Sequence, residues 1–214
     1  MRIQDEYPQI RCHPYGAVTL MEFKDILAEG KAFRQQAFAL YEAAFPEEEK
    51  KPRELMERLA GEGKMELLAV TEEERFVGLA FNMLDEELAL LDYFAIAPGL
   101  RSGGFGGRAI RCLLEKFAGK KYIFEIEKQD PRAENAEERK RRKKFYLRNG
   151  LKETGLFVNV YATDFELLTP DGSLTFEEYV MVLRDILGEE GLKKLNPRVI
   201  PVEKEKNDGT AGSR

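Results

Sequence analysis

Eight residues from Arg101 to Arg108 carry the clearest chemical signal of this sequence. They read Arg-Ser-Gly-Gly-Phe-Gly-Gly-Arg, with four glycines among five consecutive positions, between an apolar run that ends at Ile96 and a helical pattern that continues to about Phe117. Glycines at a strand-to-helix junction let the backbone turn tightly and bring several N–H groups close to one external group. The following helix adds unpaired amides and the positive end of its dipole, so the segment predicts a cradle for phosphate oxygens.

The spacing of these glycines excludes the two commonest phosphate loops. A P-loop ends in Gly-Lys-Ser/Thr, whereas Gly107 is followed here by Arg108 and Ala109. The dinucleotide-binding fingerprint needs G-x-G-x-x-G and an acidic residue about twenty positions later in a βαβ unit, and the segment lacks this pattern. A glycine-rich turn without a ligand is the alternative interpretation.

The pattern Arg101-x-x-Gly104-x-Gly106 resembles the R-x-x-G-x-G signature of acetyl-CoA-dependent N-acetyltransferases of the GNAT superfamily. Residues 91–98 (Leu-Asp-Tyr-Phe-Ala-Ile-Ala-Pro) resemble the fourth strand of that family, and residues 145–151 (Phe-Tyr-Leu-Arg-Asn-Gly-Leu) resemble its F-Y-x-x-x-G-F signature. Two motifs in the right order are more specific than either alone. The resemblance covers about residues 21–168 and is strongest over 90–151.

This resemblance implies an α/β (α+β) fold with a mixed, mainly antiparallel central sheet flanked by helices. The fourth and fifth strands of such a sheet splay apart, and acetyl-CoA lies in the gap. The backbone of Phe94, Ala95 and Ile96 would pair with the pantetheine arm. Arg101 and Arg108 would add charge-assisted hydrogen bonds. The pyrophosphate would be held by six backbone amides, those of Ser102, Gly103, Gly104, Phe105, Gly106 and Gly107.

Two side chains are candidates for the catalytic proton transfers. Tyr146 matches the tyrosine that stands near the cofactor sulfur in many GNAT enzymes, and a phenol with a pKa of about 10 can protonate a departing thiolate. Glu125 occupies the fifth-strand position that relays the amine's proton in some members, and burial would raise its pKa toward the range of a base. Glu127 and Asp92 are alternatives to it, as is an outward-facing carboxylate without a role. A backbone N–H at the splayed strand, such as that of Ile96, would face the oxyanion.

The chain departs from the family pattern just before Tyr146. Where many relatives have N-x-x-A-x-x-F-Y, Arg139 and Arg142 replace the asparagine and the small residue. The basic run at 139–144 is either a solvated helix face or a contact for the 3′-phosphate of the cofactor. The chain is also several residues longer between Glu125 and Tyr146 than in compact members.

Hydrophobic periodicity supplies the elements that position these residues. Helices are predicted from residue 31 to the Phe-Pro pair at 45–46, over 53–59, from the glycine loop to 117, across the basic run, and from the capping box at 175–178 to about 186. Strands are predicted at 21–27, 65–70, 75–84, 88–96 and 122–127, with 151–155 and 157–163 as a final pair and 165–168 as a further extended piece. The charged connection at 45–52, bounded by prolines, is predicted to be exposed. It is either a solvated loop or, as the resemblance to the GNAT superfamily implies, a border of the acceptor site whose acidic residues would suit a cationic acceptor.

The length of 214 residues suits one domain with appendages. We expect an N-terminal extension at 1–18, a GNAT-like domain at 19–168, a helical appendage at 169–195 and a disordered tail at 196–214. The formal charge of -5 argues against general nucleic-acid binding, and no apolar run is long enough for a bilayer. Two cysteines and a start without a secretion signal predict a cytoplasmic protein. The one histidine, His13, makes histidine catalysis and a histidine metal site poor interpretations.

Together these observations predict an acetyl-CoA-dependent N-acetyltransferase acting on a primary amine of a small molecule or peptide. Acetyl-CoA is the acyl-donor cosubstrate, no metal is expected, and neither nucleic acid nor membrane is an expected partner. A homodimer is compatible with the sequence. The rival interpretation is a non-catalytic acyl-CoA-binding regulatory module.

Overall fold

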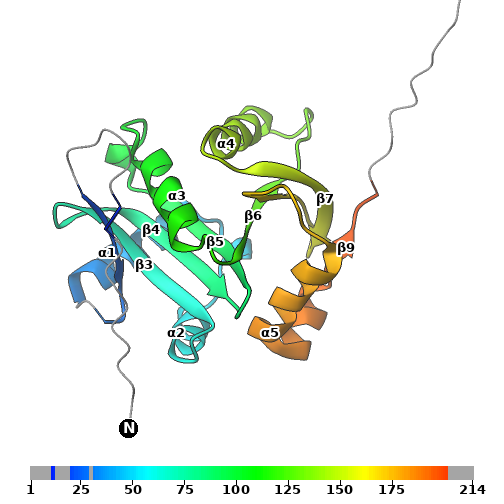
Figure 1. Ribbon diagram of the computed structural model, residues 1–214, viewed down its shortest axis with the longest axis horizontal. Helices are drawn as coiled ribbons and strands as arrows, with labels where there is room; N and C mark the ends of the chain where they lie inside the picture. Colours follow the sequence, from blue (N-terminus) through cyan, green and yellow to red (C-terminus); the bar gives the residue numbers. More distant parts are fainter. Residues whose placement is uncertain (1–10, 13–19, 29–30, 202–214) are drawn as a thin grey trace, which may run out of the picture.

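The strands of the computed structural model, which describes residues 11–12, 20–28 and 31–201, form one sheet (Figure 1). Their order across the sheet is β1-β2-β3-β4-β5-β6-β8-β7-β9. Neighbouring strands in the described chain run antiparallel except β5 and β6, which are parallel. The bounds are β1 Arg11–Cys12, β2 Met21–Asp25, β3 Met65–Glu72, β4 Arg75–Leu84, β5 Leu88–Ile96, β6 Lys121–Glu127, β7 Lys152–Val160, β8 Thr163–Thr169 and β9 Arg198–Val199.

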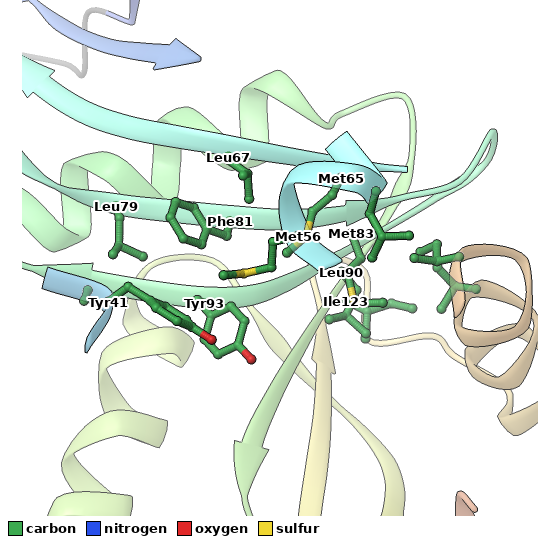
Figure 2. Packing of buried hydrophobic residues seen from close by; sticks show 14 of the residues in the cluster. Tyr41, Met56, Met65, Leu67, Leu79, Phe81, Met83, Leu90, Tyr93 and Ile123 are labelled. Carbon is green, nitrogen blue, oxygen red and sulfur yellow. The ribbon is translucent and has the colours of Figure 1, made fainter. Parts of the chain in front are cut away.

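Helices cover both faces of this sheet. One face, which we call the α1–α2 face, packs against α1 (Lys31–Ala44), α2 (Arg53–Gly61) and α5 (Phe176–Leu195), and Figure 2 shows part of its apolar core. The other, the α3–α4 face, packs against α3 (Phe105–Lys116) and α4 (Ala136–Arg148). Two short 3-10 helices, η1 (Glu47–Glu49) and η2 (Pro98–Leu100), lie in the connections. The mixed sheet flanked by helices confirms the predicted fold class.

A β-bulge interrupts β5 at Asp92. Phe81 of β4 lies opposite Tyr93 and Asn82 lies opposite Leu91, so Asp92 has no partner residue on β4. The extra residue reverses the alternation of side chains along the strand. Leu90 and Tyr93 therefore both pack on the α1–α2 face, although they are three positions apart.

Beyond this point β5 and β6 separate. Their parallel pairing runs from Leu88 opposite Lys121 to Leu91 opposite Phe124. After Leu91, β5 continues to Ile96 paired with β4, whereas β6 continues to Glu127 paired with β8. The predicted splay of the fourth and fifth strands, counted from Met21, is confirmed at β5 and β6 and is visible in Figure 1.

The prediction for the final strands was wrong. Residues 151–155 and 157–163 do not pair with each other, because 152–160 form the single strand β7, whose partner β8 begins at Thr163. The register shifts between Glu153 and Phe157, and Gly155 there has a φ of 75°. The irregularity at Gly155 is therefore a bulge inside one strand and not a connection between two.

The prediction that residues 196–214 form a disordered tail was wrong for 196–201. Asn196 ends α5 in the left-handed conformation with a φ of 46°, and β9 then pairs with β7 through Val199 opposite Val158. Residues 202–214 lie outside the described residues, as do 1–10 and 13–18 of the predicted N-terminal extension.

Helix α5 begins at the predicted capping box. The Thr175 side chain accepts a hydrogen bond from the Glu178 amide, and the Glu178 carboxylate accepts one from the Thr175 amide. Four buried side chains fix the helix on the α1–α2 face: Tyr179, Val182, Leu183 and Ile186. Within the described segments, no helix has the length and apolar character that a bilayer span requires.

Thr175→Ala should therefore destabilise the protein by about 1 kcal/mol, because the Glu178 amide loses its acceptor. Urea unfolding of both proteins measures this difference. Thr175→Ser, which keeps the hydroxyl, should stay close to wild type. Equal stability of the alanine and serine variants would show that the cap does not hold the helix.

Candidate active site

The glycine loop ends with several backbone amides that have no partner in the described chain. Gly104 has a φ of 78°, which favours glycine, and α3 begins at the next residue. The first intrahelical bond runs from the Arg108 amide to the Gly104 carbonyl at 3.2 Å. Among the described residues, no acceptor is bonded to the amides of 102 or 104–107, whereas the Gly103 amide donates to Leu100. Five of the six predicted amides are thus available to an anion.

The space in front of this loop is open at Gly104. A β-carbon placed there would meet no atom within 4 Å. Gly107 serves a different purpose, because a β-carbon there would lie 2.8 Å from Asn149 Oδ1. That oxygen accepts a hydrogen bond from Arg111 of α3 at 2.7 Å, and Nδ2 of the same Asn149 side chain donates to the Phe145 carbonyl at 2.8 Å. The missing side chain at Gly107 lets the end of α4 pack closely on α3.

Both predicted phosphate-binding arginines have partners within the protein. Arg108 forms an ion pair with Glu72, and its guanidinium lies 4.8 Å from the centre of the Phe105 ring. Arg101 Nε donates to the Ile96 carbonyl at 3.2 Å. A phosphate contact from Arg108 would therefore compete with Glu72, whereas the Arg101 guanidinium uses only its Nε in this bond.

The open edge of β5 presents main-chain groups to the gap between β5 and β6. The Ala97 amide donates to the Val77 carbonyl of β4 at 2.9 Å. Antiparallel pairing alternates, so the amide and carbonyl of Ala95 point the same way, and those of Phe94 and Ile96 point away from β4, the Ile96 carbonyl being the one that accepts from Arg101 Nε. Two of the three residues predicted to pair with pantetheine have the required orientation.

Tyr146 is buried on the α3–α4 face beside this gap. Its ring packs against Phe124 of β6 at 5.4 Å and against Phe145 at 5.2 Å between ring centres. Burial raises the pKa of Tyr146 to about 12. In the described part of the chain, no hydrogen-bond acceptor or donor is paired with its phenol. The phenol keeps its proton at neutral pH and has it available for an external group.

Glu125 lies on the opposite, α1–α2 face, as the alternation from Phe124 requires. Its Oε1 accepts a hydrogen bond of 2.5 Å from the hydroxyl of Tyr179. The pKa of Glu125 is raised to about 7, mainly by burial; the Tyr179 hydrogen bond and Lys51 lower the pKa, and the charge of Asp92 raises it. A carboxyl that titrates near neutral pH can serve as a general base.

Asp92 and Glu127, the two alternatives to Glu125, differ in their surroundings. Asp92 Oδ1 accepts a hydrogen bond of 2.8 Å from Lys51 Nζ, and its Oδ2 is buried without a partner among the described residues. Glu127 instead forms ion pairs of 2.9 Å with Arg139 and with Arg142. Glu127 therefore holds α4 on β6, while Asp92 belongs to the same buried cluster as Glu125.

Arg139 and Arg142, which depart from the family pattern, therefore have a structural role: both form ion pairs with Glu127. Lys143 of the same basic run pairs with Glu166 of β8 at 2.8 Å and also with Glu153. The remaining members of the run, Lys140, Arg141 and Lys144, are exposed. The run is thus divided between contacts to the sheet and a solvated face.

Lys51 comes from the connection between α1 and α2 and was missed by the sequence interpretation, which treated this connection as exposed and acidic. The Lys51 amide donates to the hydroxyls of Tyr41 at 2.8 Å and Tyr93 at 3.1 Å. The two rings meet edge to face at 4.8 Å and lie side by side in Figure 2. Lys50 also pairs with Glu42 and Glu47, which offsets part of the acidity. Tyr93 and Tyr179 were likewise missed as site residues.

No protein-family model matches the sequence, and no curated protein matches it. Solved structures do match the fold. An acetyltransferase from Bacteroides thetaiotaomicron, named as a member of the GNAT family, is 23% identical with a TM-score of 0.62, covering 77% of this chain and 94% of that one. An aminoglycoside 6′-N-acetyltransferase complexed with coenzyme A is 15% identical with a TM-score of 0.54, covering 69% and 94%. The ribosomal-protein-S18-alanine N-acetyltransferase of Escherichia coli is 17% identical with a TM-score of 0.50, covering 73% and 97%.

The chain therefore has the GNAT fold, as the sequence motifs predicted. The likeness extends over nearly the whole length of each of these three proteins.

The raised pKa of Glu125 predicts a pH-dependent stability. Its pKa rises on folding from 4.5 to about 7, so the native state favours the protonated form. The resulting stabilisation is complete below the unfolded pKa and is lost as the pH rises through the folded one. Relative to Glu125→Gln, wild type should lose up to about 3 kcal/mol of unfolding free energy between about pH 4.5 and 8. Urea unfolding across this range tests the prediction, and parallel curves for the two proteins would contradict it.

Proposed function

We propose that this protein is an acetyl-CoA-dependent N-acetyltransferase that transfers an acetyl group to a primary amine of a small molecule or peptide. One arrangement carries the proposal. The gap between β5 and β6 has free loop amides at its mouth, the Tyr146 phenol on one face of the sheet and the Glu125 carboxyl on the other. The GNAT fold and the coenzyme A bound to the aminoglycoside acetyltransferase that shares it support the same conclusion.

The residues present fit a CoA thioester. The unpaired amides at 102 and 104–107 would hold the diphosphate, and the open space at Gly104 leaves room for it. The main-chain groups of Phe94 and Ile96 would pair with the pantetheine arm in the manner of a strand. Acetyl-CoA, when bound, supplies an activated acetyl group at the point where the strands separate.

The chemistry that the chain itself contributes is the transfer of two protons. Glu125, with a pKa of about 7, would take a proton from the acceptor ammonium, leaving a neutral amine. As the nitrogen–carbon bond forms and the carbon–sulfur bond breaks, the Tyr146 hydroxyl would give its proton to the departing thiolate. The nitrogen loses its second proton as the amide forms, an equivalent proton returns to the Tyr146 phenolate through solvent, and Glu125 releases its own proton to water. An N–H of the open β5 edge, such as that of Ile96, would face the oxyanion. The proposal assigns no step to a metal.

A non-catalytic acyl-CoA-binding regulatory module is the second candidate. One observation favours it: the ammonium of Lys51 already occupies Asp92 on the face where an acceptor amine would approach. In such a module the donor site would persist without an acceptor. A cytoplasmic location and a homodimer are further parts of the proposal that rest on the sequence.

A thiol-release assay separates these two candidates. Wild-type protein with acetyl-CoA is tested against polyamines, aminoglycosides, amino acids and peptide N-termini, with hydrolysis in the absence of amine as the baseline. Release that depends on an amine, together with an acetylated product, supports the enzyme. Binding of CoA in calorimetry with no amine accepted would favour the regulatory module.

Gly104→Ala should weaken CoA binding by about tenfold or more, because the altered turn misdirects amides that each contribute a charge-assisted hydrogen bond. Calorimetric titration with CoA measures the effect. Gly155→Ala is a matched control, because Gly155 has a φ of 75° and open space around its Cα but lies in β7. Equal affinities of the two variants would remove the loop from the binding site.

Tyr146→Phe should lower kcat by about 10²- to 10⁴-fold, the usual contribution of a general acid, and leave the affinity for CoA unchanged. The ring, which packs on Phe124, is kept in this variant. Steady-state kinetics and calorimetry together measure both quantities. An unaltered kcat would exclude the phenol as the proton donor.

A further inference from the structure

We propose that Tyr179 is a positioning residue of the active site: its hydroxyl holds the carboxylate of Glu125 in place and makes α5 part of the catalytic machinery. This inference rests on the proposed function, in which Glu125 is the general base. It adds a residue from the C-terminal helix, which lies outside all the motifs that connect the sequence with acetyl transfer.

The geometry holds both partners of this hydrogen bond rigidly. The Tyr179 hydroxyl and Glu125 Oε1 are 2.5 Å apart. The Tyr179 side chain is fully buried in the core of the α1–α2 face, so its ring cannot swing away. The preceding residue, Glu178, closes the capping box and pairs with Lys121 at the start of β6 at 2.6 Å. The strand that carries Glu125 and the helix that carries Tyr179 are therefore fastened together next to the bond.

The hydrogen bond uses one carboxylate oxygen of Glu125 and leaves the other oxygen for the amine of the acceptor substrate. Three ionisable groups from three elements act on this carboxyl: Asp92 of β5, Lys51 of the α1–α2 connection and Tyr179 of α5. Burial and the charge of Glu125 raise the pKa of Tyr179 well above its ordinary value. The phenol therefore remains a donor over the whole range in which Glu125 titrates.

Removal of this donor should change the pKa of Glu125 in a defined direction. A hydrogen bond to a carboxylate favours the ionised form, so Tyr179→Phe should raise the pKa of Glu125 above about 7 and free its side chain to rotate. Phenylalanine keeps the ring that fills the core. The change is therefore confined to one oxygen atom.

The first test measures Glu125 itself and needs no substrate. Carbon-13 NMR of glutamate-labelled protein follows the Glu125 carboxyl through a pH titration, with its resonance assigned by its loss in Glu125→Gln. In Tyr179→Phe the midpoint should move upward by about one pH unit. Tyr122→Phe is the matched control, because Tyr122 lies on β6 like Glu125 but on the α3–α4 face, and the change removes a buried hydrogen bond of 2.6 Å to Asn82 of β4. An unmoved midpoint in Tyr179→Phe, or an equal shift in the control, overturns the inference.

The second test asks whether the reaction follows this titration. The acid limb of kcat/KM against pH, measured with an accepted amine, should move upward in Tyr179→Phe by the same amount as the carboxyl. The KM for acetyl-CoA should not change. A carboxyl shift without a kinetic shift would show that Glu125 is not the base, and it would overturn the positioning role. If wild type accepts no amine, the proposed function fails, whereas the titration still decides whether Tyr179 governs Glu125.

Discussion

The end of the hydrogen bonding between β5 and β6 is the constraint on which the rest of the site depends. The two strands pair over only four residues of each, from Leu88 to Leu91 and from Lys121 to Phe124. Past that point each strand keeps its partner on the outer side, so the sheet stays intact while a row of main-chain donors and acceptors on β5 becomes available. Unpaired strand edges attract extended ligands, and here the edge lies between two strands of one sheet.

The bulge at Asp92 sets the chemistry of this gap. An extra residue in β5 places Asp92 and Tyr93 so that both reach Lys51, one through its carboxylate and one through its phenol. The buried charges there nearly balance, because the ion pair of Lys51 with Asp92 leaves Glu125 as the group whose protonation changes near neutral pH. Burial of a carboxyl normally costs stability, and the Tyr179 hydrogen bond offsets part of that cost. The two faces of the sheet thus carry different groups: the Tyr146 phenol on the α3–α4 face keeps its proton near neutral pH, and the Glu125 carboxyl on the α1–α2 face exchanges its proton there.

The backbone signals in the sequence were read successfully because they are local. The glycines between 103 and 107 and the capping box at Thr175 act within a few residues, and each produced the expected element. The features that depend on residues far apart in the sequence could not be predicted in this way, because local patterns do not reveal them. In a strand that is apolar on both faces, a bulge changes no visible pattern, so Asp92 stood out only as one acid in an apolar run. Tyr179 occupies an apolar position of its helix, and periodicity cannot show that its hydroxyl reaches Glu125.

Charge patterns were the weakest guide. Lys51 reads as part of a solvated acidic loop, but two tyrosines from distant elements hold its backbone and turn its side chain inward. Arg139 and Arg142 read as a departure from a cofactor contact, and they are instead the partners of Glu127. Strand β9 escaped prediction because two residues gain order from pairing with β7 and not from their own propensity.

A crystal structure with CoA bound would show whether the gap between β5 and β6 is the cofactor site. We expect the diphosphate within hydrogen-bond distance of the amides at 104–107, the pantetheine arm along Phe94 and Ile96, and the sulfur at the separation of β5 and β6, between Tyr146 and Glu125. CoA bound elsewhere, or a gap between the two strands filled by side chains in its presence, would contradict it.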